Sequence, residues 1–160
     1  TTEVINQATL QYHLSTHRSQ RGLSGWSMGG YGATLFAAKH ATHFSAVAPI
    51  IALLDFPRSN LPTGQSYKIP LSRFGKNPTI WKELNPITQV NKLKSTQLLI
   101  ITADEAFDRT MNHNFANQLK KHNIPFQFKQ LNGGHTFDVV RKALPLVVNF
   151  MNQSIIPPSK

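Results

Sequence analysis

The sequence predicts an α/β fold, in which a parallel sheet carries helices on both faces. Three observations support this prediction. Apolar runs alternate with segments of helical periodicity, the pattern of repeated strand–helix–strand units. The run LLIITA at 98–103 is strongly apolar, as expected of a strand covered on both faces. The glycine-rich stretch GWSMGGYG at 25–32 links one apolar run directly to a helical segment.

Strands and helices are expected to alternate after a first, weak helix. Four runs of apolar or alternating residues are typical of strands, at 21–26, 44–51, 98–103 and 124–131. Four segments are expected to be helical, at 3–18, 28–39, 108–122 and 136–151. This order predicts one sheet with helices packed against it.

Individual positions within the helical segments sharpen the prediction. Met111, Phe115 and Leu119 recur every four residues and predict the buried stripe of the third helix. Pro145 is expected to kink or split the last helix, because proline removes a backbone donor and clashes with the preceding turn. In the first helix the expected apolar contacts are Val4, Ala8, Leu10 and Leu14.

The segment 52–97 lacks clean periodicity and is interrupted by prolines. It is too long for a plain loop, so we expect an irregular insert of short helices over the carboxyl ends of the strands. Ligands bind at those ends in open α/β sheets. Asn77, Trp81 and Phe56 are expected either to line a pocket there or to pack within the insert.

Composition restricts the functional classes. The 160 residues predict a single domain, 1–160, with a net charge of +10 that arises from only seven acidic residues. The basic residues are scattered, so we expect no nucleic-acid partner. There is no cysteine and no apolar run long enough to span a membrane, and neither a metal nor a cofactor is expected. The absence of cysteine is compatible with any redox compartment.

Ser27 has the sequence context of an activated nucleophile. Gly25-Trp26-Ser27-Met28-Gly29 matches G-x-S-x-G between a predicted strand and a predicted helix. Glycine is expected at both ends of the motif because side chains there would collide with the neighbouring strand and helix. The Met28 N–H, at the helix start, is expected to form one half of an oxyanion hole. A glycine-rich turn that binds phosphate is the alternative interpretation.

A serine nucleophile needs a base and an orienting acid, which follow it in the order Ser, acid, His in this architecture. His135 is the expected base because it follows two glycines after the last strand, whereas His113 and His122 fall within a helix. Asp104 is the expected acid because it comes directly after the strand 98–103. Asp108 is the alternative acid, although it is equally suited to cap the next helix.

Three blocks of the chain together resemble one protein family. They are GLSGWSMGGYGATLFAAKHATHFSAVAPI at 22–50, LLIITADEAFD at 98–108 and LNGGHTFDVVRKALPLVVNFM at 131–151. A further segment, FGKNPTIWKELNPITQV at 74–90, adds to the resemblance. These blocks are similar to the Putative esterase family of α/β-hydrolases, which includes esterase D (S-formylglutathione hydrolase), small carboxylesterases and mycolyltransferases. The similarity covers roughly 20–152.

The resemblance implies that Ser27 is the nucleophile, Asp104 the acid and His135 the base, with Met28 as an oxyanion donor. Trp26 and Phe137, where the family often has Leu and Trp, are the expected substrate-binding residues. Family members carry several strands before the nucleophile block, so this chain resembles the C-terminal half of the fold. It is either a piece of a larger enzyme or a small relative. The exposed sheet edge predicts self-association into a homo-oligomer or limited stability.

The expected activity is hydrolysis of a small-molecule carboxylic ester through an acyl-serine intermediate. A thioesterase or an acyltransferase would use the same three residues. An alternative of another class is an inactive hydrolase remnant that binds a partner through its basic surface. The lack of the strands that family members carry before the nucleophile block favours this alternative. The intact set of Ser, Asp and His favours the enzyme.

Overall fold

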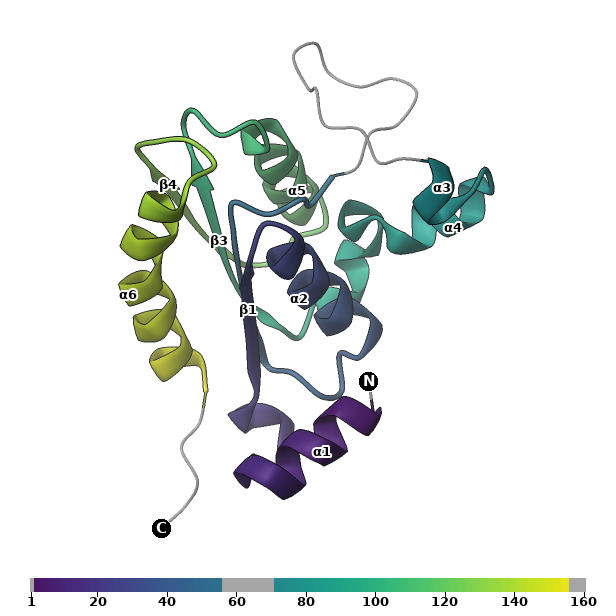
Figure 1. The fold of residues 1–160 in the computed structure, drawn as a ribbon, viewed down its shortest axis with the longest axis vertical. Helices are drawn as coiled ribbons and strands as arrows, with labels where there is room; N and C mark the ends of the chain where they lie inside the picture. Colours follow the sequence, from purple (N-terminus) through teal and green to yellow (C-terminus); the bar gives the residue numbers. More distant parts are fainter. Residues whose placement is uncertain (1, 56–70, 156–160) are drawn as a thin grey trace.

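A computed structural model describes residues 2–55 and 71–155 of the chain. Its centre is a parallel sheet of four strands in the order β1 (Gly22–Trp26), β2 (Ala46–Ile50), β3 (Gln97–Ala103) and β4 (Gln127–Leu131). The helices are α1 (Thr2–Tyr12), α2 (Met28–Lys39), α3 (Leu71–Phe74), α4 (Pro78–Leu84), α5 (Arg109–Lys121) and α6 (Phe137–Ser154). Two 3₁₀ helices, η1 (Arg18–Gln20) and η2 (Pro86–Leu93), complete the list. The predicted α/β fold is confirmed (Figure 1).

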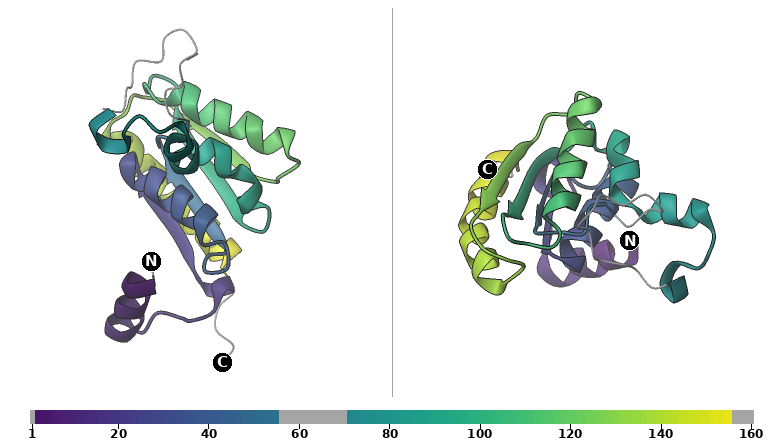
Figure 2. Two further views of the ribbon diagram at one scale, coloured as in Figure 1. Left: turned by 90° about the vertical axis from the view of Figure 1, so that its right-hand side faces the viewer. Right: turned by 90° about the horizontal axis from the view of Figure 1, so that it is seen from above.

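The two faces of the sheet are covered by different helices. Figures 1 and 2 show α6 alone on one face and α2, η2 and α5 on the other. Successive residues of β3 alternate between two cores: Leu98 and Ile100 join the core under α2 and α5, whereas Leu99 and Ile101 join the core under α6. Because a parallel strand is buried on both sides, its sequence is an unbroken apolar run.

The prediction for the third helix is confirmed, and the predicted split of the last helix is not. In α5 the stripe of Met111, Phe115 and Leu119 is fully buried, as predicted. The expected split of the last helix is wrong, because α6 continues for 18 residues through Pro145. Pro145 lies on the exposed side, so water can bind the carbonyl group that the proline leaves without a donor. The buried side of α6, from Val139 to Phe150, holds the helix against the sheet.

The insert after β2 packs partly where the sequence predicted. Phe74, Trp81 and Leu84 pack on Leu53, which follows β2, and on Met111 at the start of α5. The Trp81 ring meets the Phe74 ring edge-on at 5.2 Å and its Nε1 donates to the Gly75 carbonyl group at 2.8 Å. Asn77 caps α4 by accepting from the Thr79 N–H. Trp81 and Asn77 therefore serve packing within the insert, and Phe56 lies outside the described residues.

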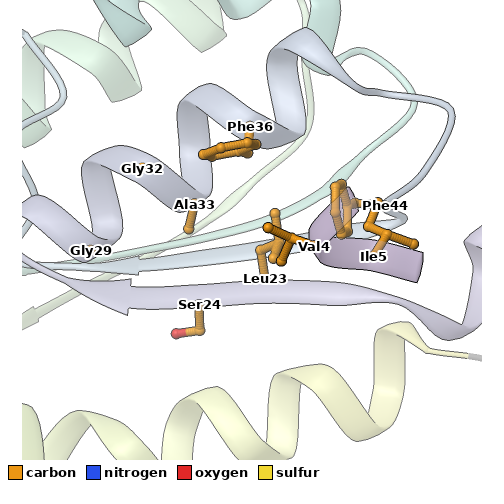
Figure 3. A pocket seen from close by; sticks show the side chains of 9 residues that line it. All are labelled: Val4, Ile5, Leu23, Ser24, Gly29, Gly32, Ala33, Phe36 and Phe44. Atoms are coloured by element: carbon orange, nitrogen blue, oxygen red, sulfur yellow. The ribbon is translucent and has the colours of Figure 1, made fainter. Parts of the chain in front are cut away.

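An apolar groove lies beside β1, at one edge of the sheet. The first helix is shorter than expected, and Leu10 and Leu14, expected as apolar contacts, are 74% and 49% exposed. Val4, although largely exposed, joins Leu23, Phe36 and Phe44 around an apolar groove of about 340 Å³ between α1, β1 and α2 (Figure 3). None of the nine residues that line the groove is charged. Among the described helices, none is both long and apolar enough to cross a membrane.

Candidate active site

Ser27 lies in a tight turn between β1 and α2, at the carboxyl end of the sheet. Its backbone has φ 55° and ψ −118°, a conformation that non-glycine residues rarely adopt. The turn is held by a hydrogen bond from the Ser27 N–H to the Ile50 carbonyl group at 3.1 Å and by one from the Tyr31 N–H to the Ser27 carbonyl group at 2.9 Å. The Ser27 side chain caps no helix N–H, so its hydroxyl group points elsewhere.

Close packing at the turn requires two glycines, but not the pair expected from the motif. A Cβ on Gly25 would lie 2.4 Å from backbone atoms of Gly29, and one on Gly30 would lie 2.6 Å from the Ala52 Cβ. A Cβ on Gly29 would meet nothing within 4 Å, and neither would one on Gly32. The expectation that Gly29 is sterically required is therefore wrong, and Gly30 is the residue that lets α2 approach β2.

Three side chains from three different loops meet at this end of the sheet. The Nε2 atom of His135 lies 2.9 Å from the Ser27 Oγ atom, and the Nδ1 atom lies 2.8 Å from the Asp108 Oδ1 atom. Because a carboxylate only accepts, Nδ1–H is the donor to Asp108, and Nε2 can accept the serine proton. The structure thus brings Ser27, His135 and Asp108 into one hydrogen-bonded chain.

The acid beside His135 is Asp108 and not Asp104, which corrects the expectation. Asp104 points its Oδ1 atom at the backbone N–H of Gly133, 2.8 Å away. The turn after β3 carries the chain past Asp104, and Asp108, at the start of α5, faces the imidazole. Asp108 does not cap α5 with its side chain, because the carboxylate is engaged by His135 and by Asn112.

Burial and hydrogen bonds shift the pKa of Asp108 in opposite directions. The side chain is fully buried, and loss of hydration raises its pKa above the ordinary aspartate value. Hydrogen bonds from His135 and Asn112 favour the carboxylate and oppose this effect. The imidazole of His135 is 17% exposed, so the base is accessible from outside while its acid is not.

Asn112 is a polar residue of the site that the sequence analysis missed. Its buried Nδ2 group lies 2.8 Å from the Asp108 Oδ2 atom and 2.9 Å from the Ala52 carbonyl oxygen. It therefore links the carboxylate to the segment after β2. The available signal was its position, because Asn112 follows Asp108 by four residues and interrupts the otherwise apolar inner face of α5.

Aromatic rings surround the imidazole. The Trp26 ring lies 5.8 Å from the His135 ring and 6.0 Å from the Phe137 ring. Phe107 was also missed in the sequence analysis. Its ring is closer to the imidazole, with a distance of 4.5 Å between the ring centroids of Phe107 and His135. Trp26, Phe107 and Phe137 are 39%, 40% and 59% exposed, so all three offer apolar surface next to Ser27.

The remaining expected residue is Met28, the first residue of α2. Its backbone N–H lies at the helix N-terminus beside Ser27, where the positive end of the helix dipole favours a developing oxyanion. Within residues 2–55 and 71–155, no group of three His, Asp or Glu side chains is placed to hold a metal ion.

Comparisons with known proteins agree with this fold. A family model described as "Putative esterase" matches residues 7–150. A ferulic acid esterase is 25% identical with a TM-score of 0.78, over 95% of this chain and 58% of its own. The serine hydrolase FphF of Staphylococcus aureus, described as fluorophosphonate-binding, is 23% identical with a TM-score of 0.73, over 94% and 61% of the two chains. An S-formylglutathione hydrolase from Agrobacterium tumefaciens is 16% identical with a TM-score of 0.80, over 98% and 56%.

The chain spans about three fifths of the length of these structures. No curated protein matched the sequence. The likeness of the solved structures shows a shared fold. The family model covers most of the chain, including the turn at Ser27 and the loop at His135. The chain therefore belongs to the Putative esterase family.

Proposed function

We propose that the protein is a serine hydrolase that cleaves carboxylic esters, with Ser27 as the nucleophile, His135 as the general base and Asp108 as the orienting acid. The observation that carries the proposal is the continuous chain of hydrogen bonds from the Ser27 Oγ atom through His135 to the buried Asp108 carboxylate. Family membership supports the same reaction.

The geometry suits a two-step acyl transfer. In the first step, the Ser27 Oγ atom bonds to the ester carbonyl carbon while its proton moves to the His135 Nε2 atom. The imidazolium then gives that proton to the leaving alkoxide, and the ester C–O bond breaks to leave an acyl-serine. In the second step, water attacks the acyl carbon with His135 again taking the proton, and the acid leaves as Ser27 is restored.

Asp108 and Met28 have supporting roles in this scheme. The Asp108 carboxylate keeps His135 in the tautomer that can accept at Nε2, and it stabilises the imidazolium that forms. The Met28 N–H donates to the oxyanion of the tetrahedral intermediate. Loss of one donor from an oxyanion hole slows turnover by about a hundred- to a thousand-fold, which is the scale of the contribution expected from the Met28 N–H.

The proposed substrate is an ester with an apolar, preferably aromatic, group beside the carbonyl carbon. Trp26 and Phe137, both predicted to bind substrate, and Phe107 form an exposed aromatic surface around the His135 ring. Such rings bind planar apolar groups by edge-on or offset contacts. One of the similar structures is a ferulic acid esterase, named for an aromatic acid, which supports the same class.

The first test is the intact mass of the folded chain after treatment with a fluorophosphonate. In that reaction the Ser27 Oγ atom bonds to phosphorus, fluoride leaves and the proton passes to His135. We expect one adduct per chain and none in Ser27→Ala. No adduct on a folded chain would refute the proposal, and labelling that persists in Ser27→Ala would refute Ser27 as its site.

Two variants test the other assignments. Asp108→Asn is expected to slow labelling by about 10⁴-fold, because the amide favours the wrong imidazole tautomer. Phe137→Ala, whose side chain is mostly exposed, should fold normally and lose more kcat/KM on an arylacyl ester than on an acetate ester. Equal losses on the two esters would place the aromatic group elsewhere.

A further inference from the structure

Asp104 is a conspicuous acidic residue next to the site that the proposed reaction does not use. It follows the last residue of β3, and its side chain is partly buried. Its Oδ1 atom accepts a hydrogen bond from the Gly133 N–H at 2.8 Å. The carboxylate thus reaches across from the β3 end to the loop that carries His135.

Backbone bonds join the same two loops on either side of this contact. The Asp104 N–H donates to the Leu131 carbonyl group at 3.0 Å, which extends the pairing of β3 with β4 by one residue. The Glu105 N–H donates to the Gly133 carbonyl group, also at 3.0 Å. Both polar groups of the Gly133 backbone are therefore bound by the turn that starts at Asp104.

Gly133 is the point at which the loop changes direction. Its φ is +127°, which side-chain-bearing residues rarely adopt, and a Cβ there would lie 2.9 Å from the Val139 Cγ2 atom. His135 follows two residues later, and α6 begins directly after Thr136. The orientation of Gly133 consequently sets the direction in which the chain enters His135.

We infer that Asp104 is a positioning residue that holds the His135 loop through Gly133, an inference that rests on the proposed function for its catalytic consequence. The turn 104–108 then contacts the His135 loop at two points. Asp104 fixes the backbone two residues before the imidazole, and Asp108 binds the imidazole itself. The task needs an oxygen acceptor at this position, because the partner is a backbone N–H group that can only donate.

The consequence concerns the two distances at His135. The imidazole must reach Ser27 Oγ on one side and Asp108 Oδ1 on the other, at 2.9 and 2.8 Å. A loop freed at Gly133 can satisfy one partner without the other. A misplacement of about 1 Å can cost roughly 100-fold in rate, even when it originates away from the reacting atoms.

The test compares Asp104→Ala, Asp104→Asn and Glu105→Ala with the unaltered chain. Asp104→Ala removes the acceptor, whereas Asp104→Asn keeps an oxygen on the same stem. Glu105→Ala is the matched control, because the described contact of Glu105 uses its backbone N–H and its side chain is exposed. Fluorophosphonate labelling and ester hydrolysis are measured on each, after circular dichroism has shown that it is folded.

We expect Asp104→Ala to lower the labelling rate and kcat by about 10- to 100-fold with a smaller effect on KM, since the described contacts of Asp104 go to Leu131 and Gly133 and not to an aromatic ring. Asp104→Asn should recover most of the rate, and Glu105→Ala should match the unaltered chain. A full rate in Asp104→Ala overturns the inference. Equal losses in Asp104→Ala and Asp104→Asn overturn it too, because they would assign the effect to the charge.

A second readout does not depend on activity. The hydrogen bond to Asp108 is expected to shift the proton NMR signal of His135 Nδ1–H downfield, and the bond to Asp104 is expected to protect the Gly133 N–H from exchange. Asp104→Asn should preserve both signals, and Asp104→Ala should weaken both. If the unaltered chain is not labelled, the proposed function fails, and these two signals decide the positioning role alone. If Asp104→Ala does not fold, Asp104→Ser, which is too short to reach Gly133, replaces it.

Discussion

The two adjacent glycines of α2 provide a sharp test of how the turn at Ser27 is built. Gly29 belongs to the G-x-S-x-G pattern, yet an added Cβ there would meet no atom within 4 Å, and Gly29 is exposed. Gly30 lies outside the pattern and is buried, and an added Cβ would lie 2.6 Å from the Ala52 Cβ and 2.7 Å from the Gly25 carbonyl oxygen. The packing therefore predicts opposite effects for Gly29→Ala and Gly30→Ala.

The expected magnitudes follow from these distances. Carbon atoms pack at about 3.5–4.0 Å, so Gly30→Ala forces a displacement of about 1 Å against the Ala52 Cβ atom and the Gly25 carbonyl oxygen, neither of which can rotate away. Overpacking of this kind costs about 1–3 kcal/mol, and the better helix propensity of alanine returns up to about 1 kcal/mol. Gly29→Ala meets no overpacking, so it should raise the free energy of unfolding by about 0.4–1 kcal/mol.

Thermal unfolding followed by circular dichroism measures both variants. For a domain of this size, 1 kcal/mol shifts Tm by about 2–4 °C. We expect Gly30→Ala to lose up to about 12 °C and Gly29→Ala to gain up to about 4 °C. Labelling by a fluorophosphonate should slow in Gly30→Ala alone, because its displacement pushes on the Gly25 carbonyl group beside the turn. A Gly29→Ala variant less stable than Gly30→Ala would refute this account of the turn.

Three further predictions follow from the packing. Pro145→Ala should raise both Tm and the free energy of unfolding, the latter by up to about 3 kcal/mol, because it restores an exposed helical hydrogen bond in α6. A lower Tm would mean that α6 needs the proline. Asn112→Ala should lower the unfolding free energy by about 1–3 kcal/mol and slow Ser27 labelling, since it removes the donor shared by Ala52 and Asp108; an unchanged Tm would contradict this. The uncharged β1 edge should pair with the same edge of a second copy, as a two-fold axis allows, and sedimentation should show dimers that Leu23→Lys dissociates; a monomer with a high Tm would count against it.

The sequence was sufficient to predict the parts of the fold that depend on short-range patterns. The apolar run of β3, the glycine-rich turn at Ser27 and the paired glycines before His135 each have a local physical cause, and the structure contains all three. Chain order then identified His135, because His113 and His122 fall in and directly after α5.

The sequence was not sufficient where the answer depends on how two loops meet. Asp104 and Asp108 are both acids in the same turn, and nothing local indicates which one faces the imidazole. The choice is made by Gly133, whose N–H binds the Asp104 side chain, and by the burial of Asp108 at the start of α5. Gly29 and Gly30 pose the same problem, since only the position of Ala52 on the neighbouring chain segment separates them.

The described contacts of the candidate triad come from neighbouring loops at one end of the sheet. Ser27 is fixed by the end of β2, Asp108 is joined through Asn112 to Ala52 after β2, and the His135 loop is held by the turn after β3. Each link joins the carboxyl ends of neighbouring strands, so the sheet itself sets the spacing of the three side chains. The groove beside β1 lies between α1, β1 and α2, and none of the residues that line it takes part in these links (Figure 3). We therefore propose that the reactivity of Ser27 depends on the hydrogen bonds at the ends of β1 to β4, and that selectivity for a substrate depends on the aromatic surface around Trp26 and Phe137.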